Sequence, residues 1–167
     1  LITDRGADWV YKNFTESNNT ENYSYTLSAC TNLLQQAFLW IATESEVNYP
    51  VSFLSEKGAR SFYAKRPFVI VSGPNTLKRI QSFGFKTFND YWDESYDQEL
   101  DHSTRIKKVM KIVNDITQMS NLDIISLATS MTDVLEYNYQ HLLNFDQYQL
   151  NCVEKQIRRN LNINDTN

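Results

Sequence analysis

The stretches AFLWIATE, residues 37–44, and PFVIVS, residues 67–72, decide the fold class of this chain. Each is a short run of apolar, β-branched and aromatic residues, which is typical of a strand buried on both faces in a parallel sheet. A helix is expected between them, from Ser55 to Lys65, because Ser55 suits an N-cap and Glu56 suits the first helical turn. Two buried strands joined by one helix predict a right-handed parallel crossover.

The alternation of strand and helix continues beyond the second strand. A helix is expected from Pro74 to about Phe83, because proline suits the first helical position and Gly84 suits a helix end. The segment FKTF, residues 85–88, predicts a third and shorter strand. Ahead of the first strand, residues 25–36 predict a short helix with its apolar side chains on one face.

The second half of the chain predicts helices only. Apolar residues keep helical spacing over residues 103–118, and Ser120 with Asp123 forms a capping-box start for the next helix. A last amphipathic helix is expected from Leu150 to Leu161. The pattern contains no internal repeat.

These elements predict one α/β domain over residues 1–167. We expect a Rossmann-like, three-layer arrangement with a short parallel sheet. In it, residues 25–100 form the α/β core and residues 101–161 form a helical C-terminal extension.

Composition and charge narrow the classes of function. The 167 residues are 41% hydrophobic and 22% charged, with a net charge of −4. This balance argues against binding to duplex nucleic acid but does not exclude a single phosphate group bound at one site. No stretch approaches the roughly 18 apolar residues of a membrane span. Cys30 and Cys152 lie far apart and suit free thiols, which predicts a reducing, cytoplasmic location without a disulfide framework.

The residues at the ends of the two strands are the strongest candidates for a binding site. In a parallel sheet, ligands bind beyond the carboxyl ends of the strands, where helix N-termini offer free N–H groups to anions. Residues 43–45 (TES) end the first strand and lead to residues 55–57 (SEK), and residues 72–75 (SGPN) end the second. Lys57 is unfavourable at a helix N-terminus unless an anion binds there. The alternative is an exposed lysine that costs little.

The acidic segment at residues 90–97 (DYWDESYD) is a second candidate site. Its carboxylates, from Asp93 to Asp97, are of the kind that bind Mg²⁺ or Mn²⁺. The favoured alternative is a loop whose carboxylates cap the following helix and face water. We therefore expect neither a bound metal nor another cofactor.

The stretch WIATES…FLSEKGARSFYAKRPFVIVSG resembles fucosyltransferases that use GDP-fucose. In those enzymes a strand with an acidic end, a loop and an aromatic-x-T-E-K motif precede a strand reading roughly P-V-V-L-G. The chain also resembles glycosyltransferase-like proteins common in marine phage genomes, in segments that here are residues 55–57, 65–68, 84–88 and 93–97. The resemblance covers about residues 25–145.

The resemblance implies the donor-binding half of a GT-B glycosyltransferase that uses a nucleotide-diphosphate sugar. It implies that Glu56 binds the ribose hydroxyls, Lys57 meets the diphosphate, Phe53 stacks near the base and Glu44 lines the donor pocket. The strand ends and the resemblance together predict these donor-site residues: Glu44, Phe53, Ser55, Glu56, Lys57, Gly73 and Asn75.

Several departures from the family pattern leave the activity open. Ser55 replaces the usual threonine, Ser45 stands where the family has asparagine, and a phosphate-binding arginine has no counterpart. The family places the acceptor site and catalytic base on a separate N-terminal domain, for which 167 residues leave no room. We therefore assign no catalytic residue and no acceptor, and the first residue, Leu1, suits a fragment or a processed product. The alternative is a non-catalytic structural or protein-interaction module, for example in a virion.

Overall fold

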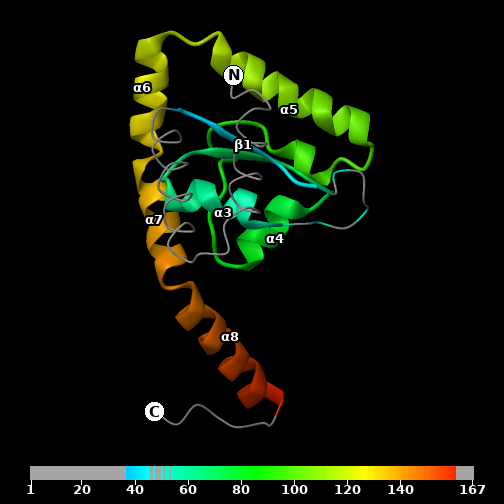
Figure 1. The fold of residues 1–167 in the computed structure, drawn as a ribbon, viewed down its shortest axis with the longest axis vertical. Coiled ribbons are helices and arrows are strands. Elements are labelled where there is room, and N and C mark those ends of the chain that lie inside the picture. Colours follow the sequence, from blue (N-terminus) through cyan, green and yellow to red (C-terminus); the bar gives the residue numbers. More distant parts are fainter. Residues whose placement is uncertain (1–36, 46, 48–49, 51, 53, 161–167) are drawn as a thin grey trace, which may run out of the picture.

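The computed structural model describes residues 37–45, 47, 50, 52 and 54–160. The helix expected over residues 25–36 lies outside the described residues. Figure 1 shows the elements, which in chain order are β1 (Trp40–Thr43), α3 (Glu56–Tyr63), β2 (Phe68–Val71), α4 (Thr76–Ser82), the 3-10 helix η1 (Ser95–Gln98), α5 (His102–Thr117), α6 (Asn121–Ser130), α7 (Thr132–Leu143) and α8 (Phe145–Asn160).

The two predicted strands pair side by side and in parallel. Their register runs from Trp40 opposite Phe68 to Thr43 opposite Val71, and α3 connects them. The predicted parallel crossover is therefore confirmed for this pair. Strand β2 is buried along its whole length, as expected. Strand β1 is not, because Ile41 remains 43% exposed, so its expected burial on both faces is wrong.

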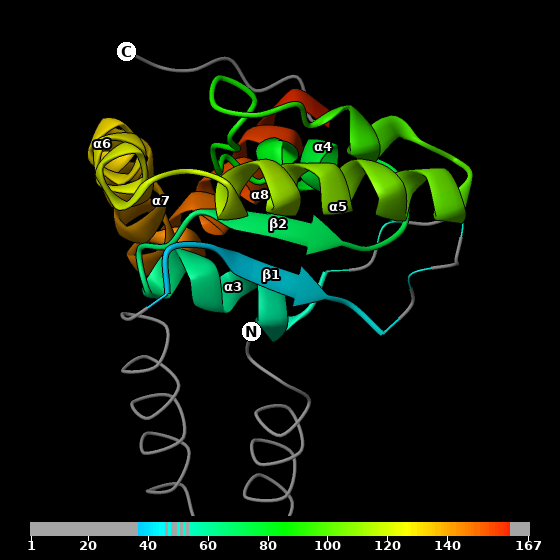
Figure 2. The same cartoon turned by 90° about the horizontal axis from the view of Figure 1, so that it is seen from above.

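Helices cover both faces of this short sheet. Helix α3 contacts both strands on one face, and α5 contacts β2 on the other, as Figure 2 shows. The rings of Phe62 on α3 and Phe85 stack at 4.2 Å between centroids, and Phe68 on β2 meets Phe62 edge-on at 5.2 Å. The described residues therefore form a mixed α/β structure with a two-stranded parallel sheet.

The predicted third strand at residues 85–88 is wrong. The segment pairs with no strand in the described part of the chain, although Phe85, Thr87 and Phe88 are buried. Its backbone is satisfied by Asn138 on α7, whose side-chain amide accepts from the N–H of Lys86 at 2.8 Å and donates to its carbonyl at 2.9 Å. Asn138 at Lys86, together with Glu94, which accepts from the N–H of Phe88 at 2.8 Å, thus takes the place of a neighbouring strand.

Three helix boundaries differ from those expected. Helix α3 ends at Tyr63 instead of Lys65, because Lys65 adopts a positive φ of 50°. Helix α4 begins at Thr76 instead of Pro74. Helix α8 begins at Phe145 instead of Leu150.

Helix α8 leads away from the sheet at the end of α7 (Figure 1). It carries Cys152, an exposed free thiol. No helix in the described ranges has the length and apolar character needed to cross a lipid bilayer.

Candidate functional site

The first candidate site lies where β1 ends and α3 begins. Glu44 follows β1 directly and is 2% exposed, and its backbone N–H donates to the carbonyl of Val71 at 2.9 Å. Its carboxylate accepts two hydrogen bonds from Ser55, from the backbone N at 3.0 Å and from Oγ at 2.6 Å. Ser55 Oγ in turn accepts from the N–H of Lys57 at 3.2 Å, which confirms Ser55 as the N-cap of α3. The structure thus brings Glu44, Ser55 and Lys57 together at one edge of the sheet.

Lys57 presents its ammonium group at the exposed rim of this edge. Lys57 Nζ donates to Ser45 Oγ at 3.1 Å. Among the side chains that the structure describes, no carboxylate forms an ion pair with it. The ammonium also lies in the first turn of α3, where the helix dipole opposes a cation. An anion bound at this rim would therefore meet a cation and a hydroxyl near the positive end of the α3 dipole, although the N–H groups of Ser55 and Lys57 are already used by Glu44 and Ser55.

Close packing holds α3 against β1 at this point. A Cβ atom at Gly58 would lie 2.8 Å from Leu54 Cδ1 and 3.8 Å from Glu44 Oε1. The indole Nε1 of Trp40 in β1 donates to the carbonyl of Lys57 at 2.9 Å. These contacts fix the amino end of α3 relative to the sheet.

The second candidate helix N-terminus, that of α4, is occupied by a carboxylate of the chain itself. Asp97 in η1 accepts from the backbone N–H groups of Leu77 at 2.8 Å and Lys78 at 3.2 Å. The N–H of Asn75, at a φ of 63°, donates to the carbonyl of Asp97 at 2.6 Å. Gly73 is buried, and its carbonyl accepts from Thr76 Oγ1 at 2.7 Å. The N–H groups of Leu77 and Lys78 are therefore already used, and this terminus adds little to an external anion site.

A buried arginine supports the same edge of the sheet. Arg105 on α5 is 3% exposed, and its guanidinium donates to the carbonyl of Ser72, just beyond β2. It also donates to the carbonyls of Val47 at 3.2 Å, Glu99 at 3.0 Å and Leu100 at 3.4 Å. Arg105 thus ties the loop after β1, the end of β2 and the start of α5 to one another.

The acidic segment around η1 is used within the protein. Asp93 accepts from the N–H of Ser95 at 2.9 Å and from its Oγ at 3.0 Å, and these bonds hold the pKa of Asp93 below its usual value. Glu94 accepts from the N–H of Phe88 at 2.8 Å. Asp97 caps α4, and burial raises its pKa in spite of those backbone hydrogen bonds and the nearby Arg105. Within the described residues, no three potential metal ligands gather in one place.

Burial also raises the pKa of Glu94 above its usual value of 4.5, although hydrogen bonds from Thr87 and Phe88 oppose the shift. The folded chain then binds more protons than the unfolded chain between pH 4.5 and the raised pKa. We therefore expect the free energy of unfolding to fall as pH rises through this window, relative to that of Glu94→Gln, which cannot titrate. Urea unfolding of both proteins at a series of pH values measures this difference.

Asp93→Asn is the matched control, since the pKa of Asp93 is lowered from 3.8 and the expected sign is opposite. The contribution of Asp93 should be complete above pH 3.8 and should disappear as pH falls through its lowered pKa. A pH-independent difference between wild type and Glu94→Gln would contradict the assignment for Glu94.

The structure describes the remaining predicted donor-site residues only in part. Phe53 lies outside the described residues. The backbone of Glu56 forms the first residue of α3, but its side chain lies outside the described part. Sequence reasoning missed the roles of Asp97 and Arg105. For Arg105, the signal in the sequence was the position of an arginine among the apolar residues of the helix expected over residues 103–118.

Comparison of the chain with protein-family models, with curated proteins and with solved structures gives no match.

Proposed function

We propose that the chain binds a nucleotide-diphosphate sugar, as the donor half of a GT-B glycosyltransferase with a Rossmann-like, three-layer domain. The observation that carries the proposal is the arrangement of Glu44, Ser55 and Lys57 at the carboxyl end of a parallel strand. In open α/β sheets, that edge is where ligands bind. The sugar, the base and the acceptor of the transfer stay open.

The side chains suggest a division of roles. Lys57 Nζ and Ser45 Oγ, 3.1 Å apart at the exposed rim, would donate to the diphosphate oxygens. Glu44 is already held by Ser55, so its role is to fix the start of α3 and to line the pocket. By the resemblance, Glu56 would bind the ribose and Phe53 would stack on the base. The positive potential comes from Lys57 and from the helix dipole, so we expect binding without a divalent metal.

We expect Lys57→Ala to weaken the binding of a nucleoside diphosphate at least about tenfold. The physical reason is the loss of a charge-assisted hydrogen bond, which contributes about 1.5–3 kcal/mol. Folding stability should hardly change, because the variant also removes a cation from a helix N-terminus. Isothermal titration calorimetry with a panel of nucleoside diphosphates at fixed salt, with and without EDTA, measures the affinity.

Lys155→Ala is a suitable control, since Lys155 is exposed on the distant α8 and the change in net charge is the same. Lys65 is less suitable, because its ammonium pairs with Glu136 at 2.5 Å and lies over the ring of Tyr139. Equal affinity in wild type and Lys57→Ala, or no binding of any nucleoside diphosphate by the wild type, would refute the proposal.

A further inference from the structure

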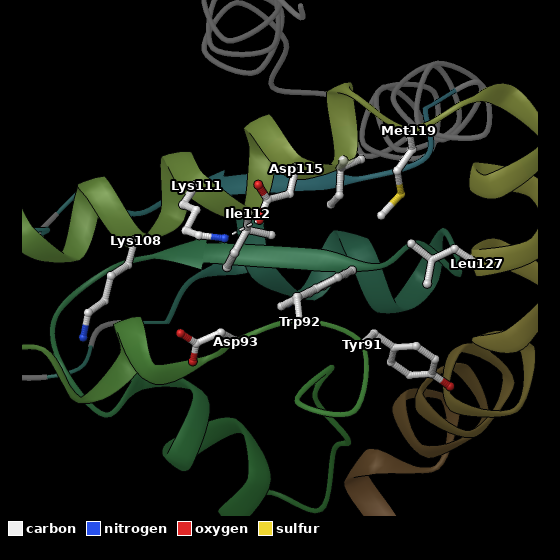
Figure 3. A pocket seen from close by; sticks show the side chains of 10 residues that line it. Tyr91, Trp92, Asp93, Lys108, Lys111, Ile112, Asp115, Met119 and Leu127 are labelled. Carbon is white, nitrogen blue, oxygen red and sulfur yellow. Dashed lines mark hydrogen bonds and ion pairs between the residues drawn. The ribbon is translucent and has the colours of Figure 1, made fainter.

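A pocket of about 240 Å³ lies along α5 (Figure 3). The residues that line it come from residues 91–93, from one face of α5 and the turn after it, and from α6. Its two ends differ in chemistry, because one is aromatic and aliphatic and the other is charged. The pocket therefore suits a ligand that has an apolar body and a charged head.

The apolar end suits a flat ring. Tyr91, Met119 and Leu127 lie around this end, as Figure 3 shows, and Trp92 also lines the pocket. The hydroxyl of Tyr91 donates to the carbonyl of Ser130 at 2.8 Å, so the ring is the part of Tyr91 that a ligand would contact. The Nε1–H of Trp92 has no acceptor among the residues that the structure describes, so no hydrogen bond fixes the indole when a second ring packs on it.

The charged end carries opposite charges that face each other without pairing. Asp93 lies in the loop before η1, whereas Lys108 and Lys111 belong to α5. Hydrogen bonds from Ser95 are the main cause that lowers the pKa of Asp93, and the charges of Lys108 and Lys111 lower it further. Among the described side chains, Asp93 forms no ion pair with either lysine. A gap therefore separates a carboxylate from two ammonium groups that are close enough to act on it.

The lysines keep donors for a ligand. Lys111 pairs with Asp115 at 2.6 Å, but the two side chains are 77% and 53% exposed, and such pairs contribute little stability. Lys108 pairs with Glu99 at 3.1 Å. Each ammonium group has three N–H donors, so one ion pair does not use all of them. The charges of the lining residues Asp93, Lys108, Lys111 and Asp115 sum to zero, so the pocket favours neither a net anion nor a net cation.

We propose that this pocket binds a small zwitterion with an aromatic body, of the chemical class of a free aromatic amino acid. The ammonium group of the ligand lies against Asp93, its carboxylate lies against Lys111, and its ring packs beside Trp92 and Met119. A head group with both charges fits the gap, because each of its charges then meets the opposite charge of the protein. An apolar cavity of about 150 Å³ binds benzene, so the pocket has room for one ring and a short polar head.

This pocket is separate from the proposed nucleotide site. Helices α3 and α5 lie on opposite faces of the sheet, as Figure 2 shows. Lys57 belongs to α3, and neither Glu44, Ser55 nor Lys57 lines the pocket. Binding of the zwitterion and binding of a nucleotide can therefore succeed or fail independently.

We expect L-phenylalanine to bind the whole chain with a dissociation constant below about 1 mM, measured by isothermal titration calorimetry. Three comparison compounds should bind at least about tenfold more weakly. They are 3-phenylpropionate, which lacks the ammonium group, phenethylamine, which lacks the carboxylate, and glycine, which lacks the ring. In a ¹H–¹⁵N correlation spectrum, L-phenylalanine should shift the indole N–H signal of Trp92. The signal of Trp40, which donates to the carbonyl of Lys57 on the other face of the sheet, should stay in place.

Two variants test the two ends of the pocket. Asp93→Asn should weaken the binding of L-phenylalanine at least about tenfold, because it removes the charge that meets the ammonium group. Met119→Lys should also weaken binding, because it brings a cation to the apolar end. A cation just beyond the end of α5 is favourable to that helix, so this variant should stay folded, which circular dichroism checks for both.

Asp146→Asn is the matched control for Asp93→Asn, because Asp146 is exposed on α8 and the change in charge is the same. It should bind L-phenylalanine as the wild type does. A wild type that does not bind L-phenylalanine below about 1 mM, equal affinity for any of the comparison compounds, an unchanged Trp92 signal, or full affinity in both pocket variants would overturn the proposal.

Discussion

Replacing Arg105 with methionine is expected to lower the free energy of unfolding by about 3–5 kcal/mol. Methionine keeps most of the aliphatic stem but supplies no N–H group. The buried carbonyl of Ser72 would lose this donor, and so would the part-buried carbonyls of Val47, Glu99 and Leu100. The largely buried carboxylate of Asp97 would also lose the favourable charge of its neighbour. Urea unfolding followed by circular dichroism at pH 7 measures the loss.

Two further variants separate the loss of the positive charge from the loss of the hydrogen bonds. Lys107→Met removes a cation from an exposed position on the same helix and should change stability by less than about 0.5 kcal/mol. Arg105→Lys keeps the charge, but one ammonium group cannot reach all the carbonyls that the planar guanidinium serves, so an intermediate loss is expected. If Arg105→Met costs less than about 1 kcal/mol, water satisfies these carbonyls and Arg105 does not tie the edge together.

Arg105→Met should also disturb the proposed nucleotide site, because Arg105 holds the backbone around it. Arg105 holds the carbonyl of Ser72 after β2 and that of Val47 in the loop from Glu44 to Ser55. Arg79 on α4 also holds this loop, by donating to the carbonyl of Ser52 at 2.9 Å. The position of Lys57 thus depends on packing that lies outside the predicted motif. A family motif gives the residues of a site but not the contacts that place them.

The sequence predicted the elements whose signals are local. The apolar run of β2 and the Ser55 cap each depend on a few adjacent residues, and both are observed. The capping box of Ser120 and Asp123 is likewise present. The parallel pairing followed from short-range patterns together with the general preference for right-handed crossovers.

The wrong predictions, the third strand and the start of α4, have a different physical cause. Both features depend on contacts with residues that are distant in sequence. Residues 85–88 alternate like a strand, but Asn138, 52 residues beyond Lys86, takes the place of a strand partner. Helix α4 starts at Thr76 because Asn75 adopts a positive φ of 63°, and the N–H of Asn75 donates to the carbonyl of Asp97, which is distant in sequence. Periodicity and capping rules use only residues that are close in sequence, so they cannot predict such contacts.

The replacement of Gly84 by alanine is expected to lower the free energy of unfolding by about 2–4 kcal/mol, combining backbone strain with a steric clash. Gly84 lies in the turn that follows α4 and has a φ of 90°. Residues with a side chain rarely adopt this backbone conformation. A Cβ atom there would lie 2.7 Å from Nε2 of His141 and 3.3 Å from Cζ of Tyr148. His141 would have to move, and the hydrogen bond between its Nε2 and the carbonyl of Phe83, at 2.7 Å, would be lost.

A double-mutant cycle with His141→Ala divides this loss into its two parts. In the His141→Ala background the clash with the imidazole is gone, so Gly84→Ala should cost mainly the strain of the positive φ, about 1–2 kcal/mol, with the contact to Tyr148 at 3.3 Å remaining. Gly58→Ala is the matched control, because the tight contacts of its new Cβ are with the ends of two aliphatic side chains, Leu54 Cδ1 at 2.8 Å and Ile70 Cδ1 at 3.2 Å, while alanine favours the helix by about 1 kcal/mol. That variant should be nearly neutral. If Gly84→Ala proves equally neutral, or costs the same with and without His141, the ring of His141 does not restrict this turn.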